Sequence, residues 1–223
     1  MISISYRACY KDDMSHAKHV SLGKARIPRQ ERSIQTRMLI LKAAEELFSA
    51  RGYHKTSTKQ IAKVAGVAIG SFYSYFDDKK VVFLEILRKH IETIIEKISS
   101  YYDMGYFKDK EPEEIIASFT QIVLDAHDLS PEFHREANLM RYCDEDVRRI
   151  HDELEEAAIL LFMPFFQTFG ERLRITDNEA AVGVILMAVE EVVHTIKIFK
   201  PKVEKERLIH ELNDMIYRYL FSG

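Results

Sequence analysis

Apolar residues recur at helical spacing along nearly the whole chain, and no alternating strand pattern or internal repeat is found. In the first third, one apolar stripe predicts a helix over residues 34–50, with Gly52 as its left-handed cap. A longer stripe begins after Asp77 and Asp78 and predicts a helix that continues to about residue 102. Between these helices, two short apolar stripes are separated by a glycine. The pattern predicts an all-α protein.

Beyond a turn-rich segment, the pattern predicts five further helices, which cover residues 113–127, 131–142, 144–169, 179–199 and 203–220. We expect Pro164 to kink or interrupt the third of these, because proline cannot donate the backbone hydrogen bond of a helix interior. Thr176 and Glu179 have the spacing of a capping box at the start of the fourth. That fourth helix is apolar on nearly every face, so it must be covered on most sides.

The segment between the first two long helices has the local signals of a helix-turn-helix. Ser57 and Gln60 are spaced as a capping box, which opens a short helix. Gly66 stands where that helix must end, because glycine adopts a left-handed cap without the penalty of a Cβ atom. Ala62 is small enough to let the two helices cross closely, and Phe72 supplies an apolar contact for the second. This spacing indicates a helix-turn-helix.

Residues 43–84 read AAEELFSARGYHKTSTKQIAKVAGVAIGSFYSYFDDKKVVFL. This stretch resembles the DNA-binding region of the TetR family of transcriptional regulators at nearly every position of that family's pattern. The resemblance implies a three-helix N-terminal head and a six-helix body, whose last two helices pack against their mates in a homodimer. We therefore expect a flexible basic extension over residues 1–32, a DNA-binding domain over residues 33–80, and a ligand-binding and dimerisation domain over residues 81–223.

The second helix of the motif would lie in the major groove of double-stranded DNA. In proteins that this chain resembles, the positions that touch DNA correspond to Thr58, Ala68, Ile69, Gly70, Ser71, Tyr73, Tyr75 and Lys79. Thr58 and Lys79 would contact phosphates, whereas Phe72 and Phe76 are expected in the core. The helix has no Arg, Asn or Gln, which make bidentate contacts with bases, so specificity would depend more on apolar contacts and DNA shape.

The net charge of −3 conceals an asymmetry between the two ends of the chain. Residues 1–80 hold 15 basic and 7 acidic side chains, whereas residues 81–223 hold 17 and 28. A basic first third beside an acidic remainder indicates that the first third meets a polyanion. Arg26, Arg29 and Arg32 could reach a minor groove, and the alternative is that the extension is an uninvolved leader.

The body holds more aromatic and methionine side chains than a thin helical bundle requires. Such side chains suit a pocket for an apolar ligand, and ordinary core packing is the alternative. The candidate lining residues are Phe119, Val123, Phe133, Met140, Phe162, Phe165, Phe166, Phe169, Met187, Glu190 and His194. Glu190, Glu191 and His194 interrupt an apolar helix, so they are either solvated, paired at the dimer interface or used to orient the ligand.

His127, His134, Glu136 and His194 could form a metal site, but no H-x-x-x-H or C-x-x-C spacing supports one, so we predict no metal and no cofactor. The two cysteines lack a zinc-type spacing, which suits a reducing cytoplasm. No run of about 18 apolar residues predicts a membrane span. The absence of a glycine-rich phosphate loop and of a nucleophile elbow argues against an enzyme.

Together these features predict a cytoplasmic, homodimeric transcriptional regulator, and a repressor rather than an activator. A small, largely apolar effector molecule would release it from a palindromic DNA operator. An effector that binds better to a conformer in which the two reading helices have another separation weakens DNA binding. DNA in turn weakens effector binding by the same coupling free energy. The long helix after the motif is the natural lever. The alternatives are a constitutive DNA-binding protein without a ligand and a helical enzyme.

Overall fold

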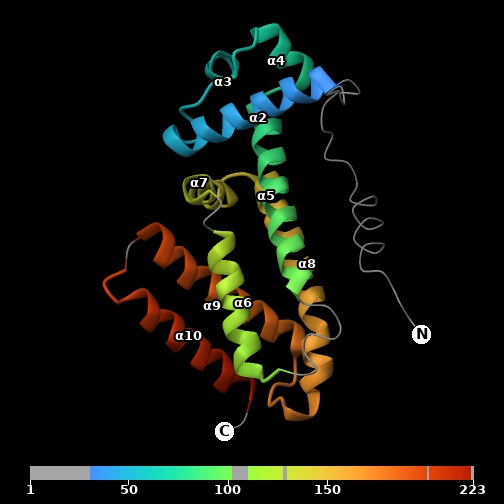
Figure 1. Cartoon of the computed structure of the whole chain (residues 1–223), viewed down its shortest axis with the longest axis vertical. Coiled ribbons are helices and arrows are strands. Elements are labelled where there is room, and N and C mark those ends of the chain that lie inside the picture. The colour runs from blue at the N-terminus through green and yellow to red at the C-terminus, as the bar shows by residue number, and fades with distance from the viewer. Residues whose placement is uncertain (1–30, 102–109, 128–129, 200, 222–223) are drawn as a thin grey trace, which may run out of the picture.

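A computed structural model describes residues 31–101, 110–127, 130–199 and 201–221, and within these ranges every named element is helical (Figure 1). The head consists of α2 (Glu31–Arg51), α3 (Thr58–Val64) and α4 (Ile69–Tyr75). The body consists of α5 (Lys79–Tyr101), α6 (Pro112–Ala126), α7 (Pro131–Arg141), α8 (Glu145–Phe169), α9 (Asn178–His194) and α10 (Lys205–Leu220). These nine α-helices of the described ranges, three in the head and six in the body, confirm the predicted all-α architecture.

Local signals begin and end the helices of the head as the sequence predicts. The capping box at α3 is formed: the Ser57 hydroxyl accepts from the Gln60 backbone N–H at 3.3 Å, and Gln60 Oε1 accepts from the Ser57 N–H at 2.8 Å. Gly52 and Gly66 have φ angles of 83° and 68°, the left-handed region that favours glycine. At the start of α5, the Asp78 carboxylate accepts two backbone N–H groups at 2.7 and 2.9 Å.

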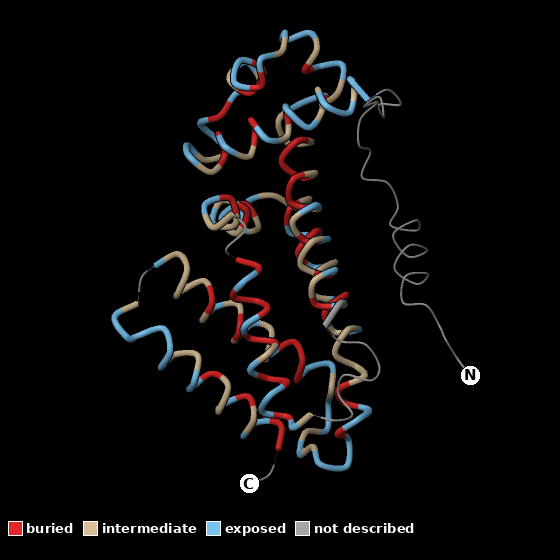
Figure 2. The backbone as a smooth tube through the Cα atoms, in the orientation of Figure 1, coloured by how far each residue is buried: buried red, intermediate tan, exposed pale blue. Residues whose placement is uncertain are grey.

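Two apolar cores hold the molecule together (Figure 2). The first core joins the head to α5, α7 and part of α8, and the ring of Phe83 packs there 5.4 Å from Phe48 and 5.0 Å from Phe133. The second core joins α6, α9, α10 and the last part of α8. Figure 1 shows α7 beneath α2 and above the α6–α9–α10 group, so α7 occupies the boundary between head and body.

Four features of the helices differ from the sequence prediction. α8 runs unbroken through Pro164, so the predicted interruption is wrong. Leu160, whose carbonyl would have paired with the missing N–H, is 61% exposed, so water can satisfy that carbonyl. Asp177, rather than Thr176, caps α9 by accepting from Ala180 N at 3.0 Å. The helix expected over residues 179–199 ends at His194 and is followed by a π-helical turn, η2 (Thr195–Phe199).

The fourth difference lies at the start of the chain. Glu31 and Arg32 are the first residues of α2 rather than the end of an extension. Arg26 and Arg29, with the rest of the predicted basic extension, lie outside the described residues. Among the helices that are described, none combines the length and hydropathy needed to cross a bilayer.

Candidate nucleic-acid interface and effector site

Helix α4 presents small and hydroxyl-bearing side chains on its outer face. Ile69 is 40% exposed and Tyr73 is 53% exposed, and Ala68 and Gly70 are exposed beside them. Phe72 is fully buried, as is Phe76 after the helix, which confirms that these two rings belong to the core. The helix therefore divides cleanly into a packed side and an open side.

Neither the backbone conformation nor the packing of the described chain requires glycine at position 70. Its φ angle is not positive, and a Cβ atom placed on it meets no atom within 4 Å. Glycine inside a helix costs roughly 0.5–1 kcal/mol relative to alanine. Any benefit of Gly70 must therefore come from a close approach of something outside the described chain.

Hydrogen bonds hold several of the hydroxyl groups on this surface. The Thr58 and Tyr73 hydroxyls lie 3.1 Å apart across the helix-turn-helix. The half-buried Tyr75 has its hydroxyl 2.9 Å from the Ser33 hydroxyl of α2. Ser71 is also half-buried. Thr58 and Tyr73 thus fix each other at the open side, whereas Tyr75 is tied back toward α2.

Lys79, which the family resemblance suggests as a phosphate contact, is bound to the loop before α3 in the described chain. Its Nζ donates to the Tyr53 carbonyl at 2.7 Å and the Thr56 carbonyl at 2.8 Å, with the His54 carbonyl at 3.5 Å. The ammonium also lies 4.3 Å from the centre of the Tyr53 ring. Burial lowers the pKa of Lys79. Lys79 therefore closes the loop before α3 within the described chain, and its phosphate contact stays a prediction.

Other basic side chains of the head are exposed near the helix-turn-helix. Lys55, Lys59 and Lys63 are all exposed, and the last two lie one turn apart on α3. The sequence analysis included these three lysines only in the net positive charge of the first third of the chain. Their helical spacing would have been the signal that singled them out.

A small apolar cavity of about 30 Å³ lies in the second core. Its lining is formed by Ile115, Ile116, Phe119, Phe162, Phe165, Phe166, Val182, Ile185, Leu186, Ile216 and Leu220. Phe119 and Phe162 meet edge to face with their ring centres 4.5 Å apart. Four of the predicted lining residues, all phenylalanines, therefore adjoin one cavity, and its size is near that of a single water molecule.

The other predicted lining residues lie elsewhere. Phe133 and Met140 belong to the first core, and Met187 is 61% exposed on the outer face of α9. Val123 and Phe169 are buried in the second core without lining the cavity. The helical period identifies each of these as apolar-facing, but it does not say which of two cores a helix faces.

Glu190 and His194 join a polar cluster instead of the cavity. His194 Nε2 lies 2.7 Å from His134 Nε2 and 3.6 Å from Glu190 Oε2, and His127 lies beside both imidazoles. Burial is the main cause that lowers the pKa of His134, to about 2, and neighbouring histidines lower it further. Glu136, the acid that the sequence suggested for this group, lies elsewhere and accepts a hydrogen bond from the Tyr53 backbone N–H. Glu191 is exposed.

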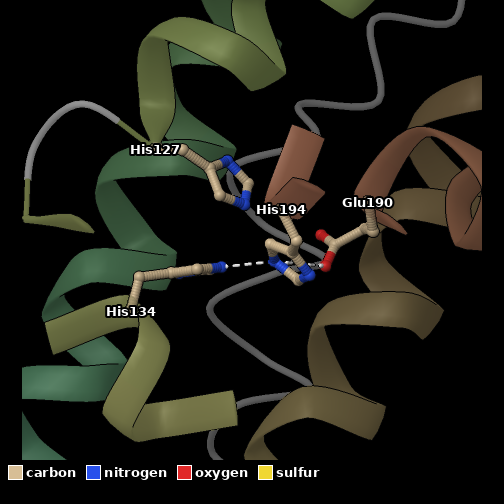
Figure 3. Close-up of side chains that lie close together, drawn as sticks. All are labelled: His127, His134, Glu190 and His194. Atoms are coloured by element: carbon tan, nitrogen blue, oxygen red, sulfur yellow. Dashed lines mark hydrogen bonds and ion pairs between the residues drawn. The ribbon is translucent and has the colours of Figure 1, made fainter. Parts of the chain in front are cut away.

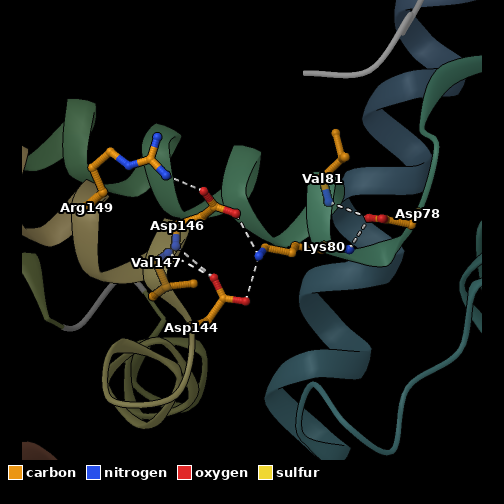
Figure 4. Close-up of polar contacts among 7 residues, drawn as sticks. All are labelled: Asp78, Lys80, Val81, Asp144, Asp146, Val147 and Arg149. Atoms are coloured by element: carbon orange, nitrogen blue, oxygen red, sulfur yellow. Dashed lines mark hydrogen bonds and ion pairs between the residues drawn. The ribbon is translucent and has the colours of Figure 1, made fainter. Parts of the chain in front are cut away.

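Ionic contacts fasten the start of α5 to the start of α8 (Figure 4). Lys80 Nζ lies 2.7 Å from a carboxylate oxygen of Asp144 and 2.7 Å from one of Asp146. These two hydrogen bonds raise the pKa of Lys80 above its usual value. Asp144 also caps α8, and Asp78 caps α5, so both helix starts are fixed around one ammonium. The start of α8 is thus tied by ion pairs to the helix that follows the reading unit.

One outer surface of the body is apolar without being covered. On α9, Val184 and Met187 are 52% and 61% exposed, and on the neighbouring α10, Met215 and Tyr219 are 50% and 41% exposed. We call these four residues the α9–α10 face. The sequence predicts that α9 is covered on most sides. Within this single chain one side of α9 remains exposed, so that prediction is met only in part.

Known proteins resemble this chain in sequence chiefly over the head. The transcriptional activator FasR of Mycolicibacterium smegmatis is 37% identical over 70 residues, 31% of this chain and 30% of that protein. The fatty acid metabolism regulator protein of Bacillus subtilis is 36% identical over 61 residues, 27% of this chain and 31% of that protein. The chain therefore matches less than a third of the length of these curated relatives.

The likeness of fold extends much further. The fatty acid degradation regulator FadR from Bacillus halodurans superposes with a TM-score of 0.63 at 20% identity, over 85% of this chain and 96% of that one. Residues 40–86 match the family model described as bacterial regulatory proteins, tetR family, and residues 112–220 match the tetracyclin repressor-like C-terminal domain. Members of this family are DNA-binding transcriptional regulators, not enzymes. With both of its parts matched in order, the chain belongs to the TetR family of transcriptional regulators.

Proposed function

We propose that this regulator is a cytoplasmic homodimer that represses transcription from a palindromic operator until a largely apolar molecule releases it. The observation that carries the DNA-binding face is Gly70, a glycine on the open side of α4 that nothing within the described chain requires. A missing side chain lets a helix backbone approach the DNA closely. The proposed division is a basic extension over residues 1–32, a DNA-binding domain over residues 33–80 and a regulatory domain over residues 81–223.

The proposed DNA contacts are formed around this glycine. Ala68 and Ile69 offer apolar contacts suited to thymine methyl groups in the major groove. Ser71, Tyr73 and Thr58 offer hydroxyls to bases or phosphates, and Tyr75 supports them from its bond with α2. Lys55, Lys59 and Lys63 join Lys79 as proposed phosphate contacts. Neutralised phosphates would then make binding strongly dependent on salt.

The α9–α10 face is the proposed dimer interface. Two copies related by a two-fold axis can bury this face against itself, and the four helices would form a bundle. A dimer places two reading helices on one side of the DNA, one helical turn of about 34–36 Å apart. Replacing Met187 and Met215 by Glu should dissociate the dimer in sedimentation velocity and abolish binding to a two-site duplex. A dimer that persists in this variant would contradict the interface.

The proposed effector binds in the apolar cavity of the second core. Only apolar side chains line it, so affinity would come from burial, at roughly 25 cal/mol per Å² of apolar surface. At about 30 Å³ the cavity must open to admit a molecule, and that opening would separate α6 and α9 from α8. A fatty acyl chain is the effector class that we infer from this lining.

Displacement of α8 provides the proposed route to the DNA. Through Asp144 and Asp146, α8 holds Lys80, and α5 follows the reading unit directly. An effector that binds better to the opened body therefore disfavours the separation of the two heads that fits the operator. The effector lowers the affinity for DNA by the same free energy by which DNA lowers the affinity for the effector.

Selection of duplexes from a random DNA pool tests the proposal. Two symmetric half-sites with centres about 10 base pairs apart are expected. Titration of the complex with fatty acids and acyl-CoA thioesters of increasing chain length should then release the DNA, with longer chains acting at lower concentration. Selection of no symmetric site would refute the operator, whereas a symmetric site that no acyl compound releases would refute only the effector.

A further inference from the structure

We propose that His127, His134, His194 and Glu190 form a binding site for a divalent transition-metal ion of the zinc class. This inference goes beyond the proposed effector function, since none of the four residues lines the apolar cavity. Each residue offers one ligand atom, and these four atoms all lie within 4.8 Å of one another. Figure 3 shows His134, His194 and Glu190 meeting in a row, with the His127 ring directed toward the same space.

The distances suit an ion after small rotations of the side chains. Zinc binds imidazole nitrogen at about 2.0–2.1 Å, so two ligand atoms of a tetrahedral ion lie roughly 3.3 Å apart. His194 Nε2 and Glu190 Oε2 are 3.6 Å apart, close to that value. His134 Nε2 and His194 Nε2 are 2.7 Å apart and would have to separate slightly. The set therefore surrounds a space of the right scale without a change in the backbone.

Hydrogen bonds orient the ring nitrogens as they do in known metal sites. His127 Nδ1 lies 2.8 Å from the Val123 carbonyl, which can only accept, so Nδ1 carries the proton and Nε2 carries the lone pair. A histidine that ligates a metal usually donates its other N–H to a carbonyl in this way. The Asn138 amide nitrogen lies 3.0 Å from His194 Nε2 and can only donate, so that Nε2 carries a lone pair, and His134 Nε2, 2.7 Å away, carries a proton in the metal-free protein. An ion bound here would displace that proton and the Asn138 contact.

The chemistry of the ligand atoms favours a transition-metal ion. The hydrogen bonds described above leave a lone pair on Nε2 of His127 and of His194, and Glu190 adds a carboxylate oxygen 3.6 Å from His194 Nε2. Imidazoles with one carboxylate suit zinc and similar ions better than magnesium or calcium.

The site lies where the two cores meet. His134 belongs to α7, whose apolar side is in the first core, whereas His127 follows α6 and the other two ligands belong to α9, both in the second core. The π-helical turn η2 begins directly after His194, and such irregular turns are frequent at functional sites. A bound ion would fasten α7 to α6 and α9.

This fastening reaches the head through a contact that is already described. Glu136, on α7 two residues after His134, accepts the Tyr53 backbone N–H next to the loop that leads into α3. The ion would thus fix the position of the helix that touches the head. Metal binding would thus be a second way to control the position of the head, independent of effector binding in the apolar cavity.

Zinc binding by the purified full chain, produced without a histidine tag and freed of metal by a chelator, tests the proposal. Competition with a zinc-sensitive dye should give one ion per chain for the parent. His134→Gln and His194→Gln should each weaken binding by more than about 100-fold, beyond the loss typical of an outer-shell partner. His210→Gln is the matched control, because His210 is exposed on α10, and it should bind zinc like the parent.

Two further readouts keep the result independent of folding. Cobalt(II) should give the visible absorption of a four-coordinate ion in the parent and lose it in Glu190→Gln, a change at a partly exposed side chain. Zinc should raise the melting temperature of the parent and of His210→Gln but not of the two ligand variants. Absence of stoichiometric zinc in the parent, or equal affinity in folded His134→Gln, His194→Gln and parent protein, would overturn the site.

Discussion

Replacing Gly70 by Ala should stabilise the protein and weaken its binding to DNA, two effects of opposite sign from one methyl group. The stabilising part follows from helix propensity, because alanine exceeds glycine by roughly 0.5–1 kcal/mol in a helix interior, and this is the upper limit for Gly70 because it is the second residue of α4. Nothing offsets this gain, since the added Cβ meets no atom within 4 Å. For a chain of this size, 1 kcal/mol shifts the melting temperature by about 2–4 °C, so a rise of up to about 4 °C is expected.

The destabilising part acts only in the complex. If the backbone of α4 approaches a base pair or phosphate at Gly70, the methyl group occupies that space and forces the helix outward. A tenfold loss of affinity corresponds to about 1.4 kcal/mol, and we expect at least that for a selected duplex measured by fluorescence anisotropy. Nonspecific DNA, which is bound mainly through phosphates, should be affected less.

Gly170→Ala is the matched control. Gly170, at the opposite end of the molecule, also has open space around its Cβ position, and its φ angle of −48° suits alanine. It should raise the melting temperature without a change in DNA affinity. Parental DNA affinity in Gly70→Ala would refute the assignment of α4's open side as the DNA face, and a lower melting temperature would refute the account of its surroundings.

Three other changes test separate parts of the structure. Lys79→Met should lower the free energy of unfolding in urea by about 1–3 kcal/mol, because two loop carbonyls lose their donor, and an unchanged salt slope of DNA binding would contradict a phosphate contact of Lys79. The pKa of His151 is lowered to about 4, mainly by burial, so the unfolded chain binds a proton below about pH 6.5 that the folded chain does not. This difference should lower stability by roughly 1.6 kcal/mol between pH 6.5 and 5, and His134, whose pKa is also lowered, adds to the fall. His151→Gln should therefore reduce the fall in chemical denaturation curves without removing it. Val182→Leu should fill the apolar cavity and raise the effector concentration for half-release while DNA affinity stays at the parental value, and an unchanged effector response would contradict the cavity as the binding place.

The sequence was most informative where structure depends on neighbours along the chain. The capping box at Ser57 and Gln60 and the left-handed Gly66 require only local geometry, so the helix-turn-helix could be predicted residue by residue. Phe72 and Phe76 were correctly separated from the open face because a helical period sorts packed from exposed positions. The same local logic places the helix boundaries within a few residues.

Features that depend on distant segments escaped prediction for a physical reason. The role of Lys79 is set by carbonyls that a folded loop brings together, and a lysine in sequence does not reveal them. The histidine cluster joins α7, α9 and the residue after α6, and its members are up to 67 positions apart, so it has no short spacing to recognise. Phe133 was expected beside the ligand pocket but lies in the first core, because its apolar character says that it is buried but not against which partner.

The polar contacts that α7 and α5 make with the loop before the reading unit are made with its main chain. Glu136 takes the N–H of Tyr53, and Lys79 takes the carbonyls of Tyr53 and Thr56, so neither contact depends on a side chain of α3 or α4. Gly52 is held to glycine by its positive φ angle and by the Glu136 carboxylate 3.1 Å from its Cβ position. If the proposed function holds, changes on the open side of α4 should alter operator preference and leave these contacts between body and loop intact. Grafting a foreign reading helix onto this frame should yield a hybrid switch with a new target and the original trigger.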